Sequence, residues 1–289
     1  LLIIGSGITG AYAAALAIQA GHHVQLVTKG VLGYSNSAFA QGGITAVTPD
    51  SVRHGDSVAS HIQDTLVAGA HRNDRRAVAH LCTEAAAHIT ALSKLGVEFD
   101  RETTPAGTSF QLGLEGAHSY PRILHVNQDA TGAGIMDALT HHLKTAEEQG
   151  RAKIYEHTAV SELVTENGAM RGVLARGTHP GAETIRLDAD AVLIATGGLG
   201  DLYKHSTNPS GASGDGVWLA WHVGAALKDL EFIQFHPTLV EGTSFMVSEA
   251  LRGEGAILRD YRGERFMPSI HPSAELASRD IVSRAIYER

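Results

Sequence analysis

The string Gly5-Ser6-Gly7-Ile8-Thr9-Gly10 has the glycine spacing that binds the pyrophosphate of a dinucleotide. The apolar run Leu1 to Ile4 predicts a strand before it, and the alanine-rich stretch Ala11 to Ala20 predicts a helix after it. Here Gly5 permits the tight turn, Gly7 lets a phosphate approach the backbone, and Gly10 lets the helix pack closely. The free N–H groups of the helix N-terminus would face the phosphates. A glycine turn without a ligand is the alternative interpretation.

Two further features bear on which dinucleotide binds. An acidic residue that contacts ribose is expected about 20 residues after the motif, but the second strand ends in Thr28-Lys29. A hydroxyl and an ammonium group suit ribose and phosphate, whereas ordinary NAD binding is disfavoured. The late strand Ala191 to Ala195, followed by Thr196-Gly197-Gly198, predicts a second close approach of the backbone, as in flavoproteins of the two-dinucleotide-binding type. The predicted cofactor is therefore FAD.

These residues require an α/β fold to position them. We predict a Rossmann-like FAD-binding domain of the two-dinucleotide-binding type with a small β-meander, followed by the start of an α+β capping domain. A change of pattern near Asp229 divides the chain into residues 1–229, an incomplete FAD-binding domain, and residues 230–289, a truncated substrate-capping domain. The apolar pattern of the sequence starts inside a strand and stops inside a helix, so we expect the chain to be a fragment of a longer protein.

The periodicity of apolar residues predicts the individual elements. A glycine- and serine-rich loop over residues 30–43 is expected to lie close to the ligand, and Glu102–His118 is expected to be polar and rich in turns. Helices are predicted over Ser57–Ala70, Arg76–Leu95, Thr131–Glu148, Asp215–Ala226 and Ser248–Arg252. The strands of the small β-meander are predicted over Lys153–Glu156, Val160–Val164, Gly172–Ala175 and Thr184–Leu187.

Composition excludes several classes of protein. The net charge of −8, the pI near 6.1 and the absence of Lys and Arg clusters argue against a nucleic-acid partner. Cys82 is the single cysteine, so an intramolecular disulfide, a thiolate zinc site and an iron–sulfur cluster are excluded. No apolar run approaches the roughly 20 residues that span a membrane, and the histidine pairs at 22–23 and 141–142 have no metal-ligand spacing. We expect a cytoplasmic protein with no metal and no membrane contact.

Longer strings carry a resemblance to a known family. In the same order and over nearly the whole chain, they resemble the succinate dehydrogenase and fumarate reductase flavoprotein superfamily and, within it, the L-aspartate oxidase family. The strings are Ser35–Gly43, His118-Ser119 with Arg122–His125, Asp129–Gly132, Ser213–Gly216, Glu231–Thr238, Glu249–Gly255 and Ser278–Asp280.

This resemblance implies a set of residues around the cofactor. Asn36 stands where membrane-bound relatives attach FAD to a histidine, and since an amide has no nucleophilic nitrogen, FAD should be noncovalent. Together, the motif and the resemblance give the cofactor-binding residues Gly5, Ser6, Gly7, Ile8, Thr9, Gly10, Thr28, Lys29, Asn36, Ser37, Ala38, Phe39, Ala40, Gln41, Gly42, Gly43, Thr158, Ala159, Thr196, Gly197 and Asp215.

The resemblance also implies a substrate site. A carboxylate at Glu115 would pair with a substrate ammonium group, which succinate lacks, while His236 and Ser248 resemble contacts to substrate carboxylates. The alternatives are a solvated loop glutamate at Glu115 and an ordinary packed or surface histidine at His236.

Proton transfer is assigned in the same way. Arg279 resembles the proton donor and acceptor of the family, and Glu249 and Arg252 resemble its relay. Because a free arginine is a poor base, this role requires the relay and a dry site. The alternative for Glu249 and Arg252 is a surface ion pair on one helix face.

The implied reaction is the oxidation of L-aspartate to iminoaspartate, with the C2 hydrogen passing as hydride to flavin N5. The resemblance further implies reoxidation by O2 or fumarate, and use of the product by quinolinate synthase in making the pyridine ring of NAD. Two alternatives remain: a soluble fumarate reductase or succinate dehydrogenase flavoprotein, against which Glu115 and Asn36 argue, and an inactive FAD-binding fragment.

Overall fold

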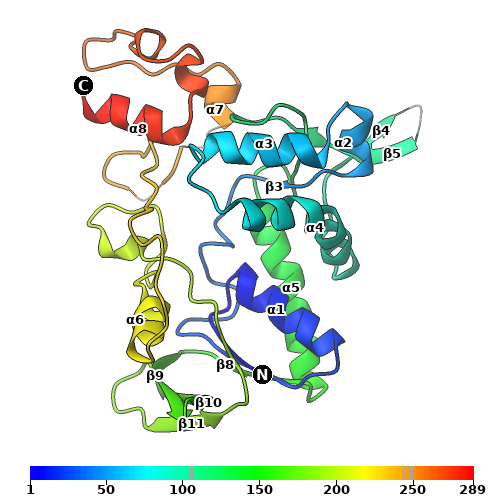
Figure 1. Cartoon of the computed structure of the whole chain (residues 1–289), viewed down its shortest axis with the longest axis vertical. Helices are drawn as coiled ribbons and strands as arrows, with labels where there is room; N and C mark the ends of the chain where they lie inside the picture. The colour runs from blue at the N-terminus through cyan, green and yellow to red at the C-terminus, as the bar shows by residue number, and fades with distance from the viewer. Residues whose placement is uncertain (105–106, 244, 248–249) are drawn as a thin grey trace. The chain divides into compact units, whose positions relative to one another are not determined.

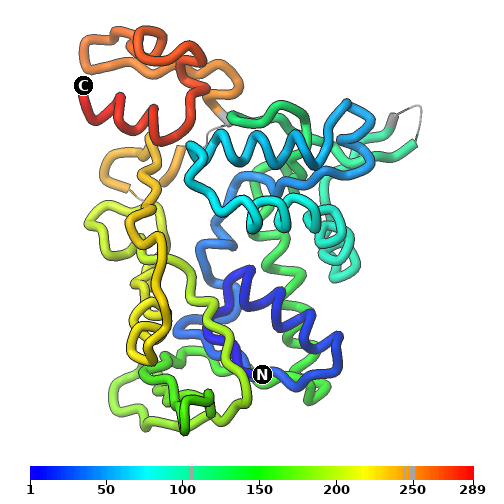
Figure 2. The backbone as a smooth tube through the Cα atoms, viewed as in Figure 1, coloured from blue at the N-terminus to red at the C-terminus, as the bar shows by residue number. Residues whose placement is uncertain are grey.

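The computed structural model describes residues 1–104, 107–243, 245–247 and 250–289, which pack into two compact units (Figure 1). Unit 1 consists of residues 1–40 and 132–233, and unit 2 of residues 41–131 and 234–289. Figure 2 traces the chain from its start in unit 1 to its end in unit 2. The expected division at Asp229 into a cofactor part and a capping part stays a prediction.

Unit 1 is built on a parallel sheet with the strand order β12-β1-β2-β8. The strand β1 is a continuous apolar run because both of its faces are covered, and its residues Leu2 and Ile3 are completely buried. Helix α1 (Ile8–Gln19) packs on β1 and β2, which confirms the predicted strand–turn–helix–strand order. The strands are β1 (Leu2–Ile4), β2 (Val24–Val27), β8 (Ala152–Tyr155) and β12 (Val192–Ile194), and helix α5 spans Thr131–Glu148 as predicted.

The predicted β-meander is present in unit 1 as the antiparallel strands β9 (Thr158–Glu166), β10 (Ala169–Gly177) and β11 (Thr184–Asp188). The predicted strand Lys153–Glu156 is not part of it. That segment is β8, which pairs in parallel with β2. A strand pattern of four residues does not specify its pairing partner, so the sequence could not distinguish the two sheets.

Helix α6 (Asp215–His222) packs against β9 and joins the two sheets of unit 1 into one core. The helix ends earlier than the predicted Ala226. Gly224 takes a left-handed conformation with φ +80°, and the Ala225 N–H donates to the Ala220 carbonyl at 3.0 Å. This glycine C-cap stops the helix. The short 3-10 helix η1 (Gly200–Leu202) precedes α6.

Unit 2 begins with helices whose first turns are capped by side chains. Ser57 accepts from the Ser60 N–H at 3.1 Å, and Asp74 accepts from the N–H groups of Arg76 and Ala77. These caps explain the sharp starts of two helices that the sequence predicts. The helices are α2 (Pro49–Arg53), α3 (Val58–Ala68) and α4 (Arg75–Lys94).

The segment predicted to be polar and turn-rich, Glu102–His118, contains strands instead. The side chain of Arg101 stacks over the Phe110 ring, 4.5 Å from its centroid, across the hairpin of β4 (Arg101–Thr104) and β5 (Gly107–Phe110). The sequence of this hairpin does not alternate apolar and polar residues, so its pattern did not predict strands. A second small sheet has the order β3-β7-β6, formed by Ile44–Thr45, Ile123–Leu124 and Leu112–Gly113.

The last segment of unit 2 surrounds a small core of Phe266, Met267 and Val282. The predicted helix Ser248–Arg252 falls partly outside the described residues, because these omit Ser248 and Glu249. The elements of this last segment are α7 (Ala250–Gly253), the 3-10 helices η2 (Met267–Ser269) and η3 (Ala274–Leu276), and α8 (Arg279–Tyr287).

Buried Glu275 organises this segment and makes it sensitive to acid. Hydrogen bonds from Arg265, at 2.6 and 2.9 Å, hold the pKa of Glu275 at about 2, well below its ordinary 4.5. Since the folded state has the lower pKa, the ionised form stabilises the fold fully above about pH 4.5, and this contribution is lost as the pH falls towards about 2.

We expect Glu275→Gln to remove this part of the acid dependence. Urea unfolding at a series of pH values should show a shallower loss of stability below pH 4.5 than in the wild type. Glu264→Gln, at an exposed position of the same segment, should keep the wild-type profile. An unchanged profile in Glu275→Gln would contradict the assignment.

Candidate active site

The glycine motif forms the turn between β1 and α1. Gly5 has φ +107°, and a Cβ atom there would lie 2.2 Å from the Ala195 carbonyl oxygen at the end of β12. A Cβ atom at Gly10 would lie 1.9 Å from the Gly5 carbonyl oxygen. Both positions therefore admit only glycine, for the turn and the close helix packing that the sequence predicts. Gly7 is the N-cap of α1 and has no side chain to occupy the helix N-terminus.

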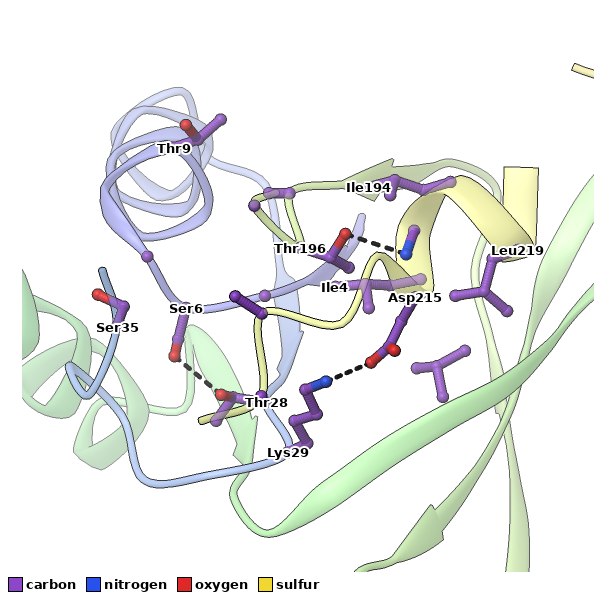
Figure 3. A pocket seen from close by; sticks show the side chains of 18 of the residues that line it. Ile4, Ser6, Thr9, Thr28, Lys29, Ser35, Ile194, Thr196, Asp215 and Leu219 are labelled. Atoms are coloured by element: carbon purple, nitrogen blue, oxygen red, sulfur yellow. Dashed lines mark hydrogen bonds and ion pairs between the residues drawn. The ribbon is translucent and has the colours of Figure 1, made fainter. Parts of the chain in front are cut away.

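A cavity of about 860 Å³ lies in unit 1 at the carboxyl ends of β1, β2 and β12 (Figure 3). Ligands bind at this edge in open parallel sheets, and the volume is near the upper end of about 300–1,000 Å³ for ligand sites. The predicted residues that line it are Gly5, Ser6, Gly7, Ile8, Thr9, Thr28, Lys29, Asn36, Ser37, Thr158, Ala159, Thr196, Gly197 and Asp215.

The other predicted cofactor residues are described by the structure but do not line this cavity. Gly10 packs against the Gly5 carbonyl oxygen in the turn. Ala40 is a backbone partner of α5, since its carbonyl oxygen accepts from the Gly132 N–H at 2.9 Å. The other predicted cofactor residues that do not line the cavity are Ala38, Phe39, Gln41, Gly42 and Gly43.

Sequence reasoning missed part of the cavity wall. Residues 209–212, immediately before the quoted string Ser213–Gly216, line it, as do Tyr34, Thr178 and Leu230. For residues 209–212 the available signal was proximity to that string, and for Tyr34 it was the glycine- and serine-rich loop over residues 30–43. Residues 209–212 precede α6, whose N-terminal residue Asp215 also lines the cavity.

Polar contacts hold the cavity wall in place. Lys29 Nζ lies 2.5 Å from Asp215 Oδ2 and donates to Ser213 Oγ at 2.9 Å, and Ser6 Oγ donates to Thr28 Oγ1 at 2.9 Å (Figure 3). Burial alone would raise the pKa of Asp215, but the hydrogen bonds from Lys29 and Ser213 outweigh it and lower that pKa. A cation, an ionised carboxylate and hydroxyl groups thus face a cavity with an uncapped helix N-terminus, which fits a ligand with phosphate and ribose groups.

The predicted substrate residue Glu115 lies in unit 2, next to a histidine that the prediction did not include. His125 Nε2 lies 3.4 Å from Glu115 Oε1. The hydrogen bond from His125 lowers the pKa of Glu115, and the charges of His125, Arg279 and His118 add to this effect against the opposing effect of burial. The structure therefore brings predicted Glu115 and Arg279 into one electrostatic neighbourhood.

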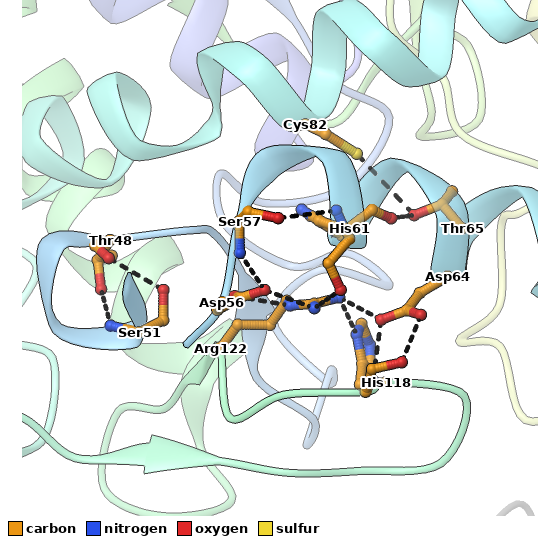
Figure 4. A network of polar contacts seen from close by, with 12 residues as sticks. Thr48, Ser51, Asp56, Ser57, His61, Asp64, Thr65, Cys82, His118 and Arg122 are labelled. Carbon is orange, nitrogen blue, oxygen red and sulfur yellow. Dashed lines mark hydrogen bonds and ion pairs between the residues drawn. The ribbon is translucent and has the colours of Figure 1, made fainter. Parts of the chain in front are cut away.

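Beneath this loop lies a buried polar network centred on Arg122, which sequence reasoning quoted only as part of a string (Figure 4). Its guanidinium group, with no exposed surface, donates to Asp56 at 2.7 and 2.9 Å and to Asp64 at 2.7 Å. Asp64 also accepts from the N–H and hydroxyl groups of Ser119 at 2.8 and 2.7 Å. Arg122 and Asp64 therefore anchor the loop that contains Glu115.

Two histidines border this network. Burial and the charge of Arg122 lower the pKa of both His61 and His118, so both are neutral near pH 7. His118 Nδ1 lies 3.4 Å from Arg122 Nη1. The positive charge of Arg122 is itself paired with the carboxylates of Asp56 and Asp64.

The remaining predicted residues lie in the last segment of unit 2. Arg279 Nη1 donates to Gln234 Oε1 at 3.1 Å, and buried Arg252 donates to the Glu275 carbonyl oxygen at 2.7 Å. His236 Nδ1 accepts from the Thr238 N–H at 3.3 Å within its own loop. The predicted residues Ser248 and Glu249 lie outside the described residues.

A protein-family model described as "FAD binding domain" matches residues 1–289. The chain belongs to the FAD-binding domain family. Its cofactor is FAD, and the cavity of unit 1 has the glycine turn, helix N-terminus and polar groups that fit this dinucleotide.

Members with curated names are similar to this FAD-binding domain. The L-aspartate oxidase of Agrobacterium fabrum is 46% identical over 291 residues, covering 99% of this chain and 52% of that protein. The L-aspartate oxidase of Bacillus subtilis is 40% identical over 291 residues, covering 100% and 52%. The chain thus spans about half the length of the curated relatives it matches.

Solved structures share the fold of this FAD-binding domain. A variant of the E. coli quinol fumarate reductase has a TM-score of 0.87 and 28% identity, covering 99% of this chain and 49% of that chain. This likeness confirms the predicted α/β fold class.

The described part of the FAD-binding domain has no cluster of metal ligands and no membrane-spanning helix. Over the described ranges of the chain, no group of three or more His, Cys, Asp and Glu side chains could hold a metal ion. No helix in the described part is long and apolar enough to cross a membrane.

We expect Gly5→Ala to destabilise the FAD-binding domain by about 1–3 kcal/mol, because the new methyl group collides with the backbone of β12. The left-handed φ of this residue adds strain. Thermal unfolding measures the effect. Gly198→Ala, where φ is ordinary and a Cβ atom has open space within 4 Å, should unfold like the wild type; equal stability of both variants would contradict the packing argument.

Proposed function

We propose that the protein oxidises L-aspartate to iminoaspartate with FAD bound noncovalently in the cavity of unit 1. The observation that carries the proposal is Glu115, a carboxylate that is kept ionised by its neighbours and is 28% exposed. Such a group suits a substrate ammonium. The names of the curated relatives support the same substrate.

The residues of this chain supply binding and charge. Glu115 would bind the ammonium group, and Arg279, in the same neighbourhood, would attract a carboxylate group of the substrate. His236 and Ser248 would contribute further carboxylate contacts. FAD, when bound, supplies the two-electron acceptor for the C2 hydrogen.

Proton transfer is the least usual part of the proposal. Arg279 would exchange the substrate proton, with Arg252 and Glu249 as a relay. Arg252 is buried and donates to a backbone carbonyl oxygen, so its position is fixed by the fold.

The same proposal includes the setting of the reaction. The electron acceptor would be O2 or fumarate, the protein would be cytoplasmic, and quinolinate synthase would use the iminoaspartate in NAD biosynthesis.

The test is the anaerobic absorbance spectrum of the intact FAD-loaded protein before and after addition of L-aspartate or succinate. We expect L-aspartate alone to bleach the oxidised flavin band. Bleaching by succinate alone would favour the second candidate, a fumarate reductase or succinate dehydrogenase flavoprotein. The similarity to the solved structure of a fumarate reductase supports this candidate. Bleaching by neither substrate would favour an FAD-binding protein without this activity.

A further inference from the structure

His125, which follows β7, lies in a slot that only glycine residues can form. A Cβ atom at Gly113 of β6 would lie 2.7 Å from His125 Cε1, and a Cβ atom at Gly43, just before β3, would lie 2.9 Å from His125 Nε2. Side chains at these positions would displace the ring. The three-stranded sheet β3-β7-β6 thus has space at both neighbouring strands for this imidazole.

The backbone of His125 is also fixed. The Asp100 N–H donates to the His125 carbonyl oxygen at 2.9 Å, while the Asp100 carboxylate accepts from the N–H groups of Asn127 and Gln128 at 2.9 and 2.8 Å. Asn127 and Gln128 are both left-handed, with φ +48° and +67°. Two successive non-glycine residues in this region require such compensation.

The ring held in this way faces Glu115. Its Nε2 lies 3.4 Å from Glu115 Oε1, and the two side chains are 21% and 28% exposed, so a ligand can reach them. The other charged or titratable groups that act on Glu115 are His118 and Arg279. Of these groups, His125 is the one that the structure hydrogen-bonds to the carboxylate.

We propose that His125 is a positioning residue that orients the Glu115 carboxylate towards a substrate ammonium, and so sets the preference for an amino dicarboxylate over a dicarboxylate without the amine. This inference rests on the proposed function. A neutral imidazole donates one hydrogen bond and leaves the second oxygen of Glu115 for the substrate.

Three variants of the intact FAD-loaded protein test the proposal. His125→Leu removes the donor, His125→Gln keeps an N–H donor without a titratable ring, and Gly113→Ala displaces the ring while every polar group remains. His80→Leu, at an exposed position on α4 of the same unit, is the control. Steady-state KM and kcat are measured with L-aspartate and with succinate, and the flavin spectrum reports cofactor loading.

We expect His125→Leu and Gly113→Ala to raise KM for L-aspartate about tenfold or more, as for loss of a hydrogen bond to a charged group. The kcat value, the flavin content and any reaction with succinate should change little. His125→Gln should restore most of the affinity. His80→Leu should match the wild type.

The outcomes separate this inference from the proposed function. Oxidation of L-aspartate by the wild type with an unchanged KM in His125→Leu would overturn the inference alone, as would equal losses for both substrates. Reduction of the wild-type flavin by succinate and not by L-aspartate would overturn the proposed function, and with it the preference assigned to His125.

Discussion

Replacing Arg122 with methionine is expected to lower the free energy of unfolding by about 3–5 kcal/mol, because removal of one partner from a buried ion pair leaves uncompensated charges. The side chains of Arg122 and Asp56 have no exposed surface, and that of Asp64 is 13% exposed. Methionine fills similar volume but offers no donor to either carboxylate. Urea unfolding at neutral pH measures the loss.

Two further variants serve as comparisons for Arg122→Met. Arg53→Met removes an exposed arginine that pairs with Asp50 in the same unit, and it should cost less than about 1 kcal/mol. Arg122→Met combined with Asp56→Leu should be more stable than Arg122→Met alone, since one buried charge is gone. A loss below 1 kcal/mol in the single variant would mean that water reaches the network.

The substitution Glu115→Gln is expected to raise KM for L-aspartate about 10- to 150-fold, equivalent to about 1.5–3 kcal/mol for a hydrogen bond that involves a charged group. Glutamine keeps the shape of the side chain but loses the charge that would bind the ammonium. Steady-state kinetics of the intact FAD-loaded protein measures KM. Glu98→Gln, at an exposed position of the same unit, is the control.

The comparison substrate makes this prediction specific. Succinate has no ammonium group, so its reduction of the flavin should be unchanged or stronger in Glu115→Gln. If KM for L-aspartate stayed at the wild-type value, the ammonium would have to bind elsewhere.

Local signals made the cofactor turn and several helices predictable from the sequence. The left-handed turn at Gly5 and the contact of Gly10 with the Gly5 carbonyl oxygen lie within one strand–turn–helix unit, and the boundaries of α5 follow from its own periodicity. The strand β8 was assigned to the wrong sheet because pairing with β2 depends on residues more than a hundred positions away. Local patterns specify an element but not its neighbour.

The candidate site shows the same distinction. Glu115 and Arg279 were predicted through resemblance, and their electrostatic proximity required the fold. His125 was quoted in a string but given no role, because its slot depends on glycines from two other strands. Arg122 was missed for the same reason: its carboxylate partners are Asp56 and Asp64, 66 and 58 positions away.

The pairing of β1 with β12 has a consequence for synthesis of the protein on the ribosome. Leu2 is in register with Val192. The strand β1 therefore cannot pair with β12 until nearly two hundred further residues have been synthesised. At about 5–20 residues per second, this delay lasts roughly 10–40 s. Throughout that time one edge of an apolar strand stays open to other nascent chains and to chaperones. The dinucleotide cavity, whose wall includes Asp215 and Leu230, is completed later still. The complete cavity is therefore available to a flavin only after residue 230 has been synthesised.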